Sequence, residues 1–199
     1  MPIIPYLYIS IPPYSNKGIK VMTEHQKVVK VFGSSRAKPE SNTYKQAFEL
    51  GGLLAEAGFV VCNGGYTGIM EASLQGAKRS GGRTIGITTE VFKQKTVSPL
   101  IDEEVRTENY IERLEKLIYT ANAFVVLKGG IGTLSEFSLV WCLVVIGEVR
   151  KPIILVGDSW QKVIKNMQKH LIMTYQETQV LSIVKTPETA VELLKRLIL

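Results

Sequence analysis

The sequence has few of the residues that build disulfide scaffolds and metal sites. Among its 199 residues are only two cysteines, Cys62 and Cys142, and only two histidines, His25 and His170. Two cysteines far apart in the chain predict neither a disulfide-stapled fold nor a zinc ribbon. Two histidines cannot form a histidine-rich metal site. We therefore expect no metal, and a reducing cytoplasmic environment is the default for such a chain.

Long apolar runs, low-complexity tracts and internal repeats are absent as well. No segment reaches the roughly 18 apolar residues that a membrane span needs, and the nearest, residues 137–147, is too short. The N-terminal residues lack the basic region and the small-residue cleavage site of a secretory signal. Prolines separated by tyrosines within residues 1–25 instead predict an extended arm, followed by a single domain over residues 26–199.

What is present is the composition of an ordinary globular protein. Hydrophobic residues make up 45% of the chain and charged residues 21%, which excludes a disordered or fibrous protein. The net charge of +6 is scattered along the chain, so a solvated surface is the simplest interpretation. The same positive excess fits a phosphorylated small molecule as partner, with nucleic acid as a lower-ranked alternative.

From residue 26 onward, short apolar runs alternate with patterns typical of helices. This alternation predicts βαβ units, and continuous apolar runs are expected where helices cover both faces of a sheet. The predicted fold is α/β, a three-layer, Rossmann-like, doubly wound and mostly parallel sheet whose ligands bind beyond the carboxyl ends of the strands. Strands are predicted at residues 28–32, 59–62, 84–87, 123–127, 152–156 and 180–184, and helices at residues 43–57, 68–80, 108–120, 133–146, 160–172 and 187–197.

Three glycine-rich turns follow predicted strands, and the first begins at Gly33. This glycine permits a tight bend, and the hydroxyls of Ser34 and Ser35 can donate hydrogen bonds. Arg36 could bind a phosphate through two parallel hydrogen bonds. An ordinary strand-to-helix turn is an equal alternative for these residues.

The second turn contains Gly64, Gly65 and Gly68 and opens a predicted helix that carries Met70 and Glu71. Glycines at such positions let the backbone approach a ligand closely, and the first amide groups of the helix can bind an anion. Tight packing of the helix against the strand is the alternative interpretation.

The third turn contains Gly129, Gly130 and Gly132, followed by Thr133 and Glu136. Glycines leave backbone amides free to surround an anion, and a helix N-terminus adds about half a positive charge. Thr133 could donate its hydroxyl to a phosphate. Alternatively, Thr133 and Glu136 could form a capping box that only closes the end of the helix.

Two widespread nucleotide-binding motifs are missing. The chain has no Gly-x-x-x-x-Gly-Lys-Ser/Thr sequence, which a Walker A loop requires, and no Gly-x-Gly-x-x-Gly sequence follows the first predicted strand. Hydride transfer with a nicotinamide cofactor is therefore disfavoured.

Taken in order, the three turns resemble the Lonely Guy (LOG) family of cytokinin-activating phosphoribohydrolases. That family has relatives labelled "possible lysine decarboxylase", and molybdenum-cofactor carriers and a branch related to DNA-processing protein A are similar to it. The resemblance covers roughly residues 28–156. The hallmark Pro-Gly-Gly-x-Gly-Thr-x-x-Glu is matched by Gly129, Gly130, Gly132, Thr133 and Glu136, and an earlier Gly-Gly-x-x-Gly-x-Met pattern by Gly64, Gly65, Gly68 and Met70.

The resemblance implies a Rossmann-like homo-oligomer, a dimer or tetramer, with a nucleotide-monophosphate site at the glycine turns. It implies that Arg113 and Glu136 are the catalytic pair of an N-glycosidase that needs no cofactor. A carboxylate can stabilise an oxocarbenium-like ribose, and an arginine supplies fixed positive charge. The remaining predicted site residues, which bind phosphate or nucleotide, are Gly33, Ser34, Gly64, Gly65, Gly68, Met70, Glu71, Gly129, Gly130, Gly132 and Thr133.

Four residues depart from the pattern of the active hydrolases. Lys128 replaces the hallmark proline, Leu114 a lysine, Ser135 a glutamate and Glu71 a glycine. Glu71 is closer to the carrier-like branch. Three hypotheses follow, in descending order: a phosphoribohydrolase acting on a purine nucleoside 5′-monophosphate, a non-catalytic carrier of a phosphorylated pterin such as molybdenum cofactor or of a nucleotide, and a single-stranded DNA binder.

Three further features bear on the site. Arg113 is predicted at the border of a buried helix face, where it could face a pocket and stay solvated, although a purely surface charge is the alternative. Residues 133–146 are predicted as a helix that is apolar nearly all round, which indicates either a central core position or a subunit interface. The resemblance to the LOG family implies the interface, because helices in this position pair across dimers in that family. Residues 90–102 form a long loop that could cover the site.

Overall fold

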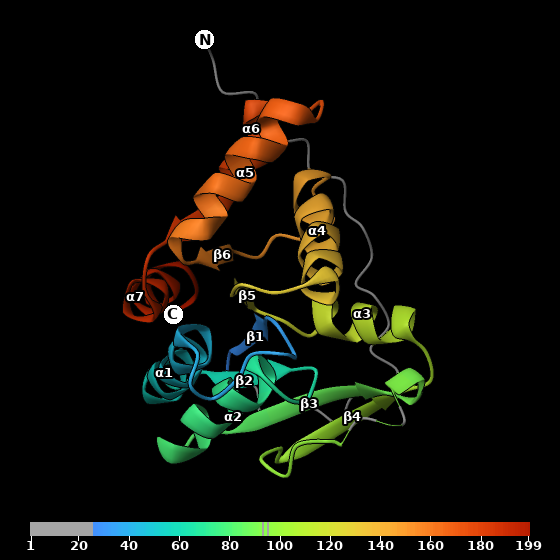
Figure 1. The fold of residues 1–199 in the computed structure, drawn as a ribbon, viewed down its shortest axis with the longest axis vertical. Helices are drawn as coiled ribbons and strands as arrows, with labels where there is room; N and C mark the ends of the chain where they lie inside the picture. The colour runs from blue at the N-terminus through green and yellow to red at the C-terminus, as the bar shows by residue number, and fades with distance from the viewer. Residues whose placement is uncertain (1–25, 93, 95) are drawn as a thin grey trace.

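The structure is a computed structural model that describes residues 26–92, 94 and 96–199, so the predicted arm at residues 1–25 lies outside the described residues. Its framework is a seven-stranded sheet with the order β4-β3-β2-β1-β5-β6-β7, in which all neighbouring strands are parallel (Figure 1). The strands are β1 (Val28–Phe32), β2 (Val60–Asn63), β3 (Thr84–Thr89), β4 (Glu103–Thr107), β5 (Ala123–Val126), β6 (Ile153–Val156) and β7 (Leu181–Val184).

Helices cover both faces of this sheet, which confirms the predicted three-layer, doubly wound α/β fold. One face packs against α1 (Asn42–Glu56), α2 (Ile69–Arg79) and α7 (Pro187–Ile198). The other packs against α3 (Tyr110–Tyr119), α4 (Ile131–Val145) and α5 (Asp158–His170). Two short elements complete the order, a 3-10 helix η1 (Glu90–Phe92) and α6 (Tyr175–Gln179). Among the described helices, none has both the length and the apolar composition needed to cross a membrane.

The central strand β1 contributes side chains to both hydrophobic layers. Val29 and Val31 lie in the cluster under α1, α2 and α7, and Val28 and Phe32 lie in the cluster under α3, α4 and α5. Burial of one such side chain stabilises the fold by roughly 1.5–3 kcal/mol. Apart from the buried Lys30, β1 carries apolar side chains on both faces. It therefore holds two helix layers at once, as expected of a strand covered on both sides.

The strand order reverses beside β1. The chain runs outward from β1 through β2 and β3 to the edge strand β4, and then returns through α3 so that β5 pairs with the other side of β1. After the carboxyl ends of β1 and β5, the chain continues into helices on opposite faces of the sheet. Open α/β sheets bind their ligands at such a point. The first and third glycine turns leave the sheet at these two strands.

The sequence pattern does not predict two elements of the structure, β4 and α6. The edge strand β4 contains Glu103, Glu104 and Arg106, and its side chains alternate between half-buried and exposed positions. Arg83 of the loop before β3 forms an ion pair with Glu103 at 2.6 Å, so polar contacts replace the apolar run that marks the inner strands. Helix α6 has only five residues, too few to show a helical period.

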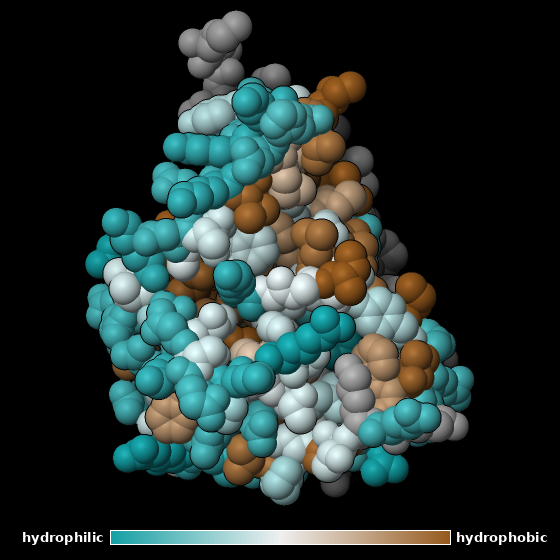
Figure 2. Space-filling model, in the orientation of Figure 1, coloured by the Kyte–Doolittle hydropathy of each residue, from teal (hydrophilic) through white to brown (hydrophobic). Residues whose placement is uncertain are grey.

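Helix α4 is amphipathic in its contacts although not in its sequence. Phe137, Val140 and Trp141 are buried against the sheet, while the apolar side chains of Ile131 and Ile146 remain 83% and 64% exposed. Figure 2 shows hydrophobic residues gathered over α4. The helix is therefore part of the core on one side and leaves an apolar stripe at the surface on the other.

Candidate functional site

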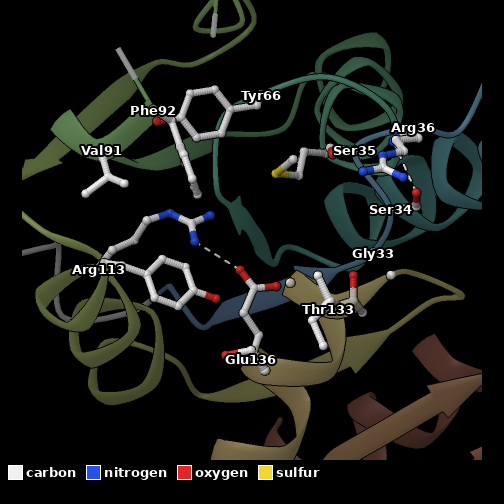
Figure 3. A pocket seen from close by; sticks show the side chains of 16 residues that line it. Gly33, Ser34, Ser35, Arg36, Tyr66, Val91, Phe92, Arg113, Thr133 and Glu136 are labelled. Carbon is white, nitrogen blue, oxygen red and sulfur yellow. Dashed lines mark hydrogen bonds and ion pairs between the residues drawn. The ribbon is translucent and has the colours of Figure 1, made fainter. Parts of the chain in front are cut away.

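A pocket of about 620 Å³ lies beyond the carboxyl ends of β1 and β5 and is lined by residues of all three glycine turns (Figure 3). Pockets of this size are typical of small-molecule sites. Eight of the predicted site residues line it: Gly33, Ser34, Met70, Arg113, Gly130, Gly132, Thr133 and Glu136.

Arg113 and Glu136 meet in the pocket although they belong to different helices. Asn109 caps the N-terminus of α3, and Arg113 lies one turn further along it. Glu136 lies on α4, which follows β5. The Arg113 Nη1 donates to the Glu136 Oε1 at 3.1 Å, so the fold brings together the two residues predicted as a catalytic pair.

Arg113 is more deeply buried than the sequence pattern indicates. We expected it at the solvated border of the helix, but it is only 3% exposed. Its Nε donates to the carbonyl oxygen of Ile87 at 2.9 Å, because α3 packs across the carboxyl end of β3. The guanidinium thus has fixed hydrogen-bond acceptors on two sides, which the pattern of a single helix cannot reveal.

Gly64 makes room for the guanidinium. A Cβ atom at Gly64 would lie 2.0 Å from the Arg113 Nη2 and 2.9 Å from the Met70 Sδ. Such distances are far below van der Waals contact, so any larger residue at Gly64 would displace Arg113. Gly64 does not line the pocket itself. Its role is to leave the space that the Arg113 guanidinium occupies.

Burial controls the protonation of Glu136. Removal from water raises the pKa of this carboxyl above its usual value, although the neighbouring Arg113 guanidinium opposes the rise. Burial disfavours the charged form, and an adjacent cation favours it. A carboxyl with a raised pKa beside a fixed cation in a pocket is a typical feature of a functional site.

The third turn places the N-terminus of α4 at one end of the pocket, which we call the anion-binding end because its chemistry suits an anion. The N-cap of α4 is Gly130, which makes no side-chain capping hydrogen bond, and the helix begins at Ile131. Thr133 is therefore inside the first turn of the helix and not its N-cap, so the capping-box interpretation of Thr133 and Glu136 is wrong. Helix starts of this kind present amide groups and partial positive charge to an anion.

The first turn forms the neighbouring wall and is held rigidly. The backbone N–H of Arg36 donates to the Ser34 Oγ at 3.1 Å, and the Ser34 carbonyl accepts from the Ile69 N–H at 2.9 Å. Thr67 donates its hydroxyl to the Ser35 carbonyl at 3.0 Å. Ser34, Ser35 and Arg36 line the pocket beside the start of α4, where their donors can contact the same anion.

Five predicted site residues do not line the pocket: Gly64, Gly65, Gly68, Glu71 and Gly129. Four of them are glycines that permit close packing behind it. Gly68 has a φ of +71°, and a Cβ there would lie 2.4 Å from the Ser34 carbonyl oxygen. A Cβ at Gly129 would lie 2.1 Å from the Thr133 Oγ1. Glu71 instead acts on Tyr44 of α1, whose pKa is raised by burial and by this carboxylate.

An aromatic wall closes the side of the pocket opposite the first turn. It consists of Tyr66, Phe92 and Tyr110, none of which was predicted as a site residue. Tyr66 and Phe92 meet edge to face at 5.7 Å between ring centroids, and Phe92 and Tyr110 at 6.2 Å. The predicted covering loop at residues 90–102 was the available signal, because it contains Phe92.

Comparison with known proteins finds chains that are similar to this one. A family model described as the SLOG cluster4 family matches residues 26–191. A cytokinin riboside 5′-monophosphate phosphoribohydrolase of Mycobacterium tuberculosis is 33% identical over 116 residues, which are 57% of this chain and 62% of that protein. An uncharacterised protein of Archaeoglobus fulgidus is 34% identical over 100 residues, 50% of this chain and 65% of that protein.

The matched region thus spans slightly less than two thirds of the length of these two relatives. Among solved structures, the molybdenum cofactor binding protein of Rippkaea orientalis is similar along nearly the whole chain. Its TM-score is 0.71 at 29% identity, and the match covers 89% of this chain and 100% of that one.

Proposed function

The chain belongs to the SLOG cluster4 family, and on that premise we propose that it is a phosphoribohydrolase of purine nucleoside 5′-monophosphates. The reaction adds water across the N-glycosidic bond and releases the free base and ribose 5-phosphate. AMP-like and cytokinin-type nucleotides are the proposed substrates. The name of the Mycobacterium tuberculosis relative supports this class of reaction.

One observation carries the proposal: the buried Arg113–Glu136 pair at 3.1 Å lies between an anion-binding end and an aromatic wall. Figure 3 shows Glu136 between Arg113 on one side and Thr133 with Gly33 on the other. A nucleoside monophosphate has the matching order of parts, a planar base, a ribose and a phosphate. Its glycosidic bond would therefore lie beside the Glu136 carboxylate.

Each part of the pocket has a physical task in this reaction. The start of α4, with Thr133 and the Ser34 hydroxyl, binds the 5′-phosphate. The aromatic wall binds the base, and stacking of one base on an aromatic side chain contributes roughly 1–3 kcal/mol. Such contacts fix the nucleotide with its glycosidic bond next to the carboxylate, and orientation of this kind can account for a large part of catalysis.

Glu136 and Arg113 carry the bond cleavage. When the bond between base and C1′ breaks, its electron pair leaves with the base and positive charge develops on the ribose. The Glu136 carboxylate stabilises that charge and accepts a proton from the attacking water, whose oxygen forms the new bond to C1′. The proton that Glu136 accepts ends on the departing base, so the carboxylate is regenerated and one water is consumed for each nucleotide. Arg113 keeps the carboxylate ionised and in place.

A second candidate function is a carrier of a phosphorylated pterin without turnover. Leu114, which stands where active hydrolases have a lysine, is 5% exposed and packs into the interior, so the position supplies no second cation to the pocket. The likeness to the Rippkaea orientalis molybdenum cofactor binding protein also favours it. The same anion-binding end and aromatic wall would bind the phosphate and the pterin ring.

Binding and turnover measured on one panel distinguish the two functions. The panel contains purine nucleoside 5′-monophosphates, the matching nucleosides without phosphate, and phosphorylated pterins. The hydrolase proposal predicts that monophosphates raise the melting temperature and yield base and ribose 5-phosphate in equal amounts. Pterin binding with no base released from any nucleotide would favour the carrier. Equal binding of nucleosides and monophosphates would contradict the anion-binding end that both functions share.

A further inference from the structure

We propose that Phe92 is a positioning residue that holds the Arg113 guanidinium in place. The Phe92 ring covers Arg113, with 5.9 Å between the guanidinium carbon and the ring centroid. Figure 3 shows Phe92 between Tyr66 and the guanidinium. An arginine over an aromatic face is attracted by the ring, and the attraction grows when the pair is removed from water. The proposal rests on the proposed function only for its kinetic consequence.

The contact completes an enclosure of Arg113 on several sides. The Nε donates to the Ile87 carbonyl and the Nη1 to Glu136, while the Nη2 lies against Gly64. Those partners contact the guanidinium nitrogens, and the guanidinium carbon lies over the Phe92 ring. Ile87 belongs to β3 and Phe92 to η1, which follows β3 directly. The continuous segment from β3 to η1 therefore supplies two of the groups beside the guanidinium, the Ile87 carbonyl and the Phe92 ring.

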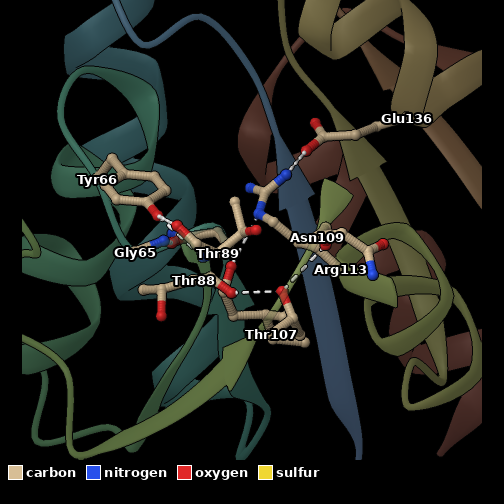
Figure 4. A network of polar contacts seen from close by, with 10 residues as sticks. Gly65, Tyr66, Thr88, Thr89, Thr107, Asn109, Arg113 and Glu136 are labelled. Carbon is tan, nitrogen blue, oxygen red and sulfur yellow. Dashed lines mark hydrogen bonds and ion pairs between the residues drawn. The ribbon is translucent and has the colours of Figure 1, made fainter. Parts of the chain in front are cut away.

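Phe92 is itself held by contacts with two tyrosines that line the same pocket. Tyr66 and Tyr110 pack edge to face on its ring. The Tyr66 hydroxyl accepts from the Thr89 N–H at 3.0 Å and donates to the Thr89 carbonyl at 3.4 Å, at the end of β3 (Figure 4). Thr107 of β4 donates its hydroxyl to the Thr88 carbonyl at 2.7 Å. The start of η1 is thus anchored by two neighbouring elements.

The test measures how well the Arg113 guanidinium is protected from water, in the protein without ligand. The exchange of the Arg113 Nε–H proton with water is followed by nitrogen-15 NMR in the wild type, Phe92→Leu and Phe92→Tyr. Leucine keeps the apolar volume but removes the ring, whereas tyrosine keeps the ring. Phe48→Leu is the matched control, because Phe48 packs against Arg79 at the same 5.9 Å, outside the pocket.

We expect Phe92→Leu to accelerate this exchange about tenfold or more, because local opening then exposes the buried N–H to water. Phe92→Tyr and Phe48→Leu should leave it near the wild-type rate. In turnover assays, Phe92→Leu should lower kcat, and Phe92→Tyr should restore it. Unchanged exchange in Phe92→Leu, or an equal acceleration in Phe48→Leu, would overturn the proposal.

The exchange measurement keeps this inference separate from the proposed function. Accelerated exchange in a protein that hydrolyses no nucleotide would support the positioning role and count against the hydrolase. Hydrolysis by the wild type with exchange and kcat unaffected by Phe92→Leu would support the hydrolase and overturn the positioning role.

Discussion

Glycine residues determine where the neighbouring side chains of this site can lie. Gly64 leaves the space that the Arg113 guanidinium fills, and Gly129 leaves the space behind Thr133. The glycine turns therefore serve the pocket in two ways. Gly130 and Gly132 line it directly, with open space around each, whereas Gly64 and Gly129 let the side chains of Arg113 and Thr133 pack closely against the turns.

Gly64→Ala should abolish the proposed base release without unfolding the protein. The added methyl would lie 2.0 Å from the Arg113 Nη2, so the guanidinium must move away from Glu136. A misplacement of about 1 Å can cost about a hundredfold in rate, and we expect kcat/KM for base release to fall by at least that factor. Gly52→Ala, in α1 and away from the pocket, is the control and should retain full activity. Normal activity of Gly64→Ala would contradict the role assigned to this glycine.

The activity should depend on the ionisation of Glu136. Because burial raises the pKa of Glu136 above its usual value, the carboxylate is lost on acidification at a higher pH than for an exposed glutamate. The carboxylate is the active form in the proposed mechanism, so kcat/KM should rise with pH through this raised pKa and then level off. A pH profile of base release measures the inflection. An inflection at the ordinary glutamate value, or activity that falls over the same range, would refute this assignment.

At the scale of whole elements, the carboxyl end of β3 organises the pocket more than any glycine turn does. Its last residues accept hydrogen bonds from Arg113 and Thr107 and contact the Tyr66 hydroxyl. The sequence predicts β3 to end at residue 87, but it continues to Thr89. Threonines at a strand end look like the start of a loop in sequence, and only pairing with β4, itself a polar edge strand, extends β3 through them.

Helix α3, which carries Arg113, is held at its other end by Lys151. The Lys151 Nζ donates to the carbonyls of Ile118 and Tyr119 at 3.0 and 2.9 Å, at the C-terminal end of the helix, where carbonyls lack the full set of helical partners. Burial, together with the nearby Lys30, lowers the pKa of Lys151 to about 8. The lysine that holds the end of α3 is therefore one whose charged form is disfavoured in the folded protein.

This lysine predicts how stability depends on pH. The unfolded chain holds the Lys151 proton up to its ordinary pKa of 10.5 and the folded chain only to about 8, so the unfolded state binds more protons between these values. The free energy of unfolding should therefore gain a contribution that grows as pH rises through this window. Urea unfolding at several pH values should show this gain in the wild type and less of it in Lys151→Met. Equal slopes in the two proteins would contradict the prediction.

At the scale of the molecule, the sequence predicts the fold class and the meeting of the three turns well, because strand periodicity and switch-point geometry are general. It also pairs Arg113 with Glu136 through the resemblance to the LOG family. It does not predict the aromatic wall. Tyr66, Phe92 and Tyr110 come from separate segments, and their contact depends on how η1 leaves β3, which no local pattern records.

The exposed stripe of α4 predicts self-association. Ile131, Leu134 and Val145 are exposed on this helix and Ile146 at its C-cap, and an apolar patch of this kind marks an interface more often than a free surface. We expect a homodimer by light scattering and its dissociation by Val145→Glu. Val163→Glu on α5 is the matched control, since Val163 is 39% exposed and Val145 37%. A wild-type monomer, or equal effects of both variants, would contradict this arrangement.

The most direct test of the account is base release by the wild type and by Glu136→Gln at saturating nucleoside 5′-monophosphate. The substitution keeps the shape of Glu136 and removes its charge. We predict that the wild type releases base and ribose 5-phosphate in equal amounts, and that the variant is slower by about a thousandfold while the nucleotide still raises its melting temperature. Equal rates in both proteins, or no release by the wild type, would contradict a hydrolase centred on Glu136.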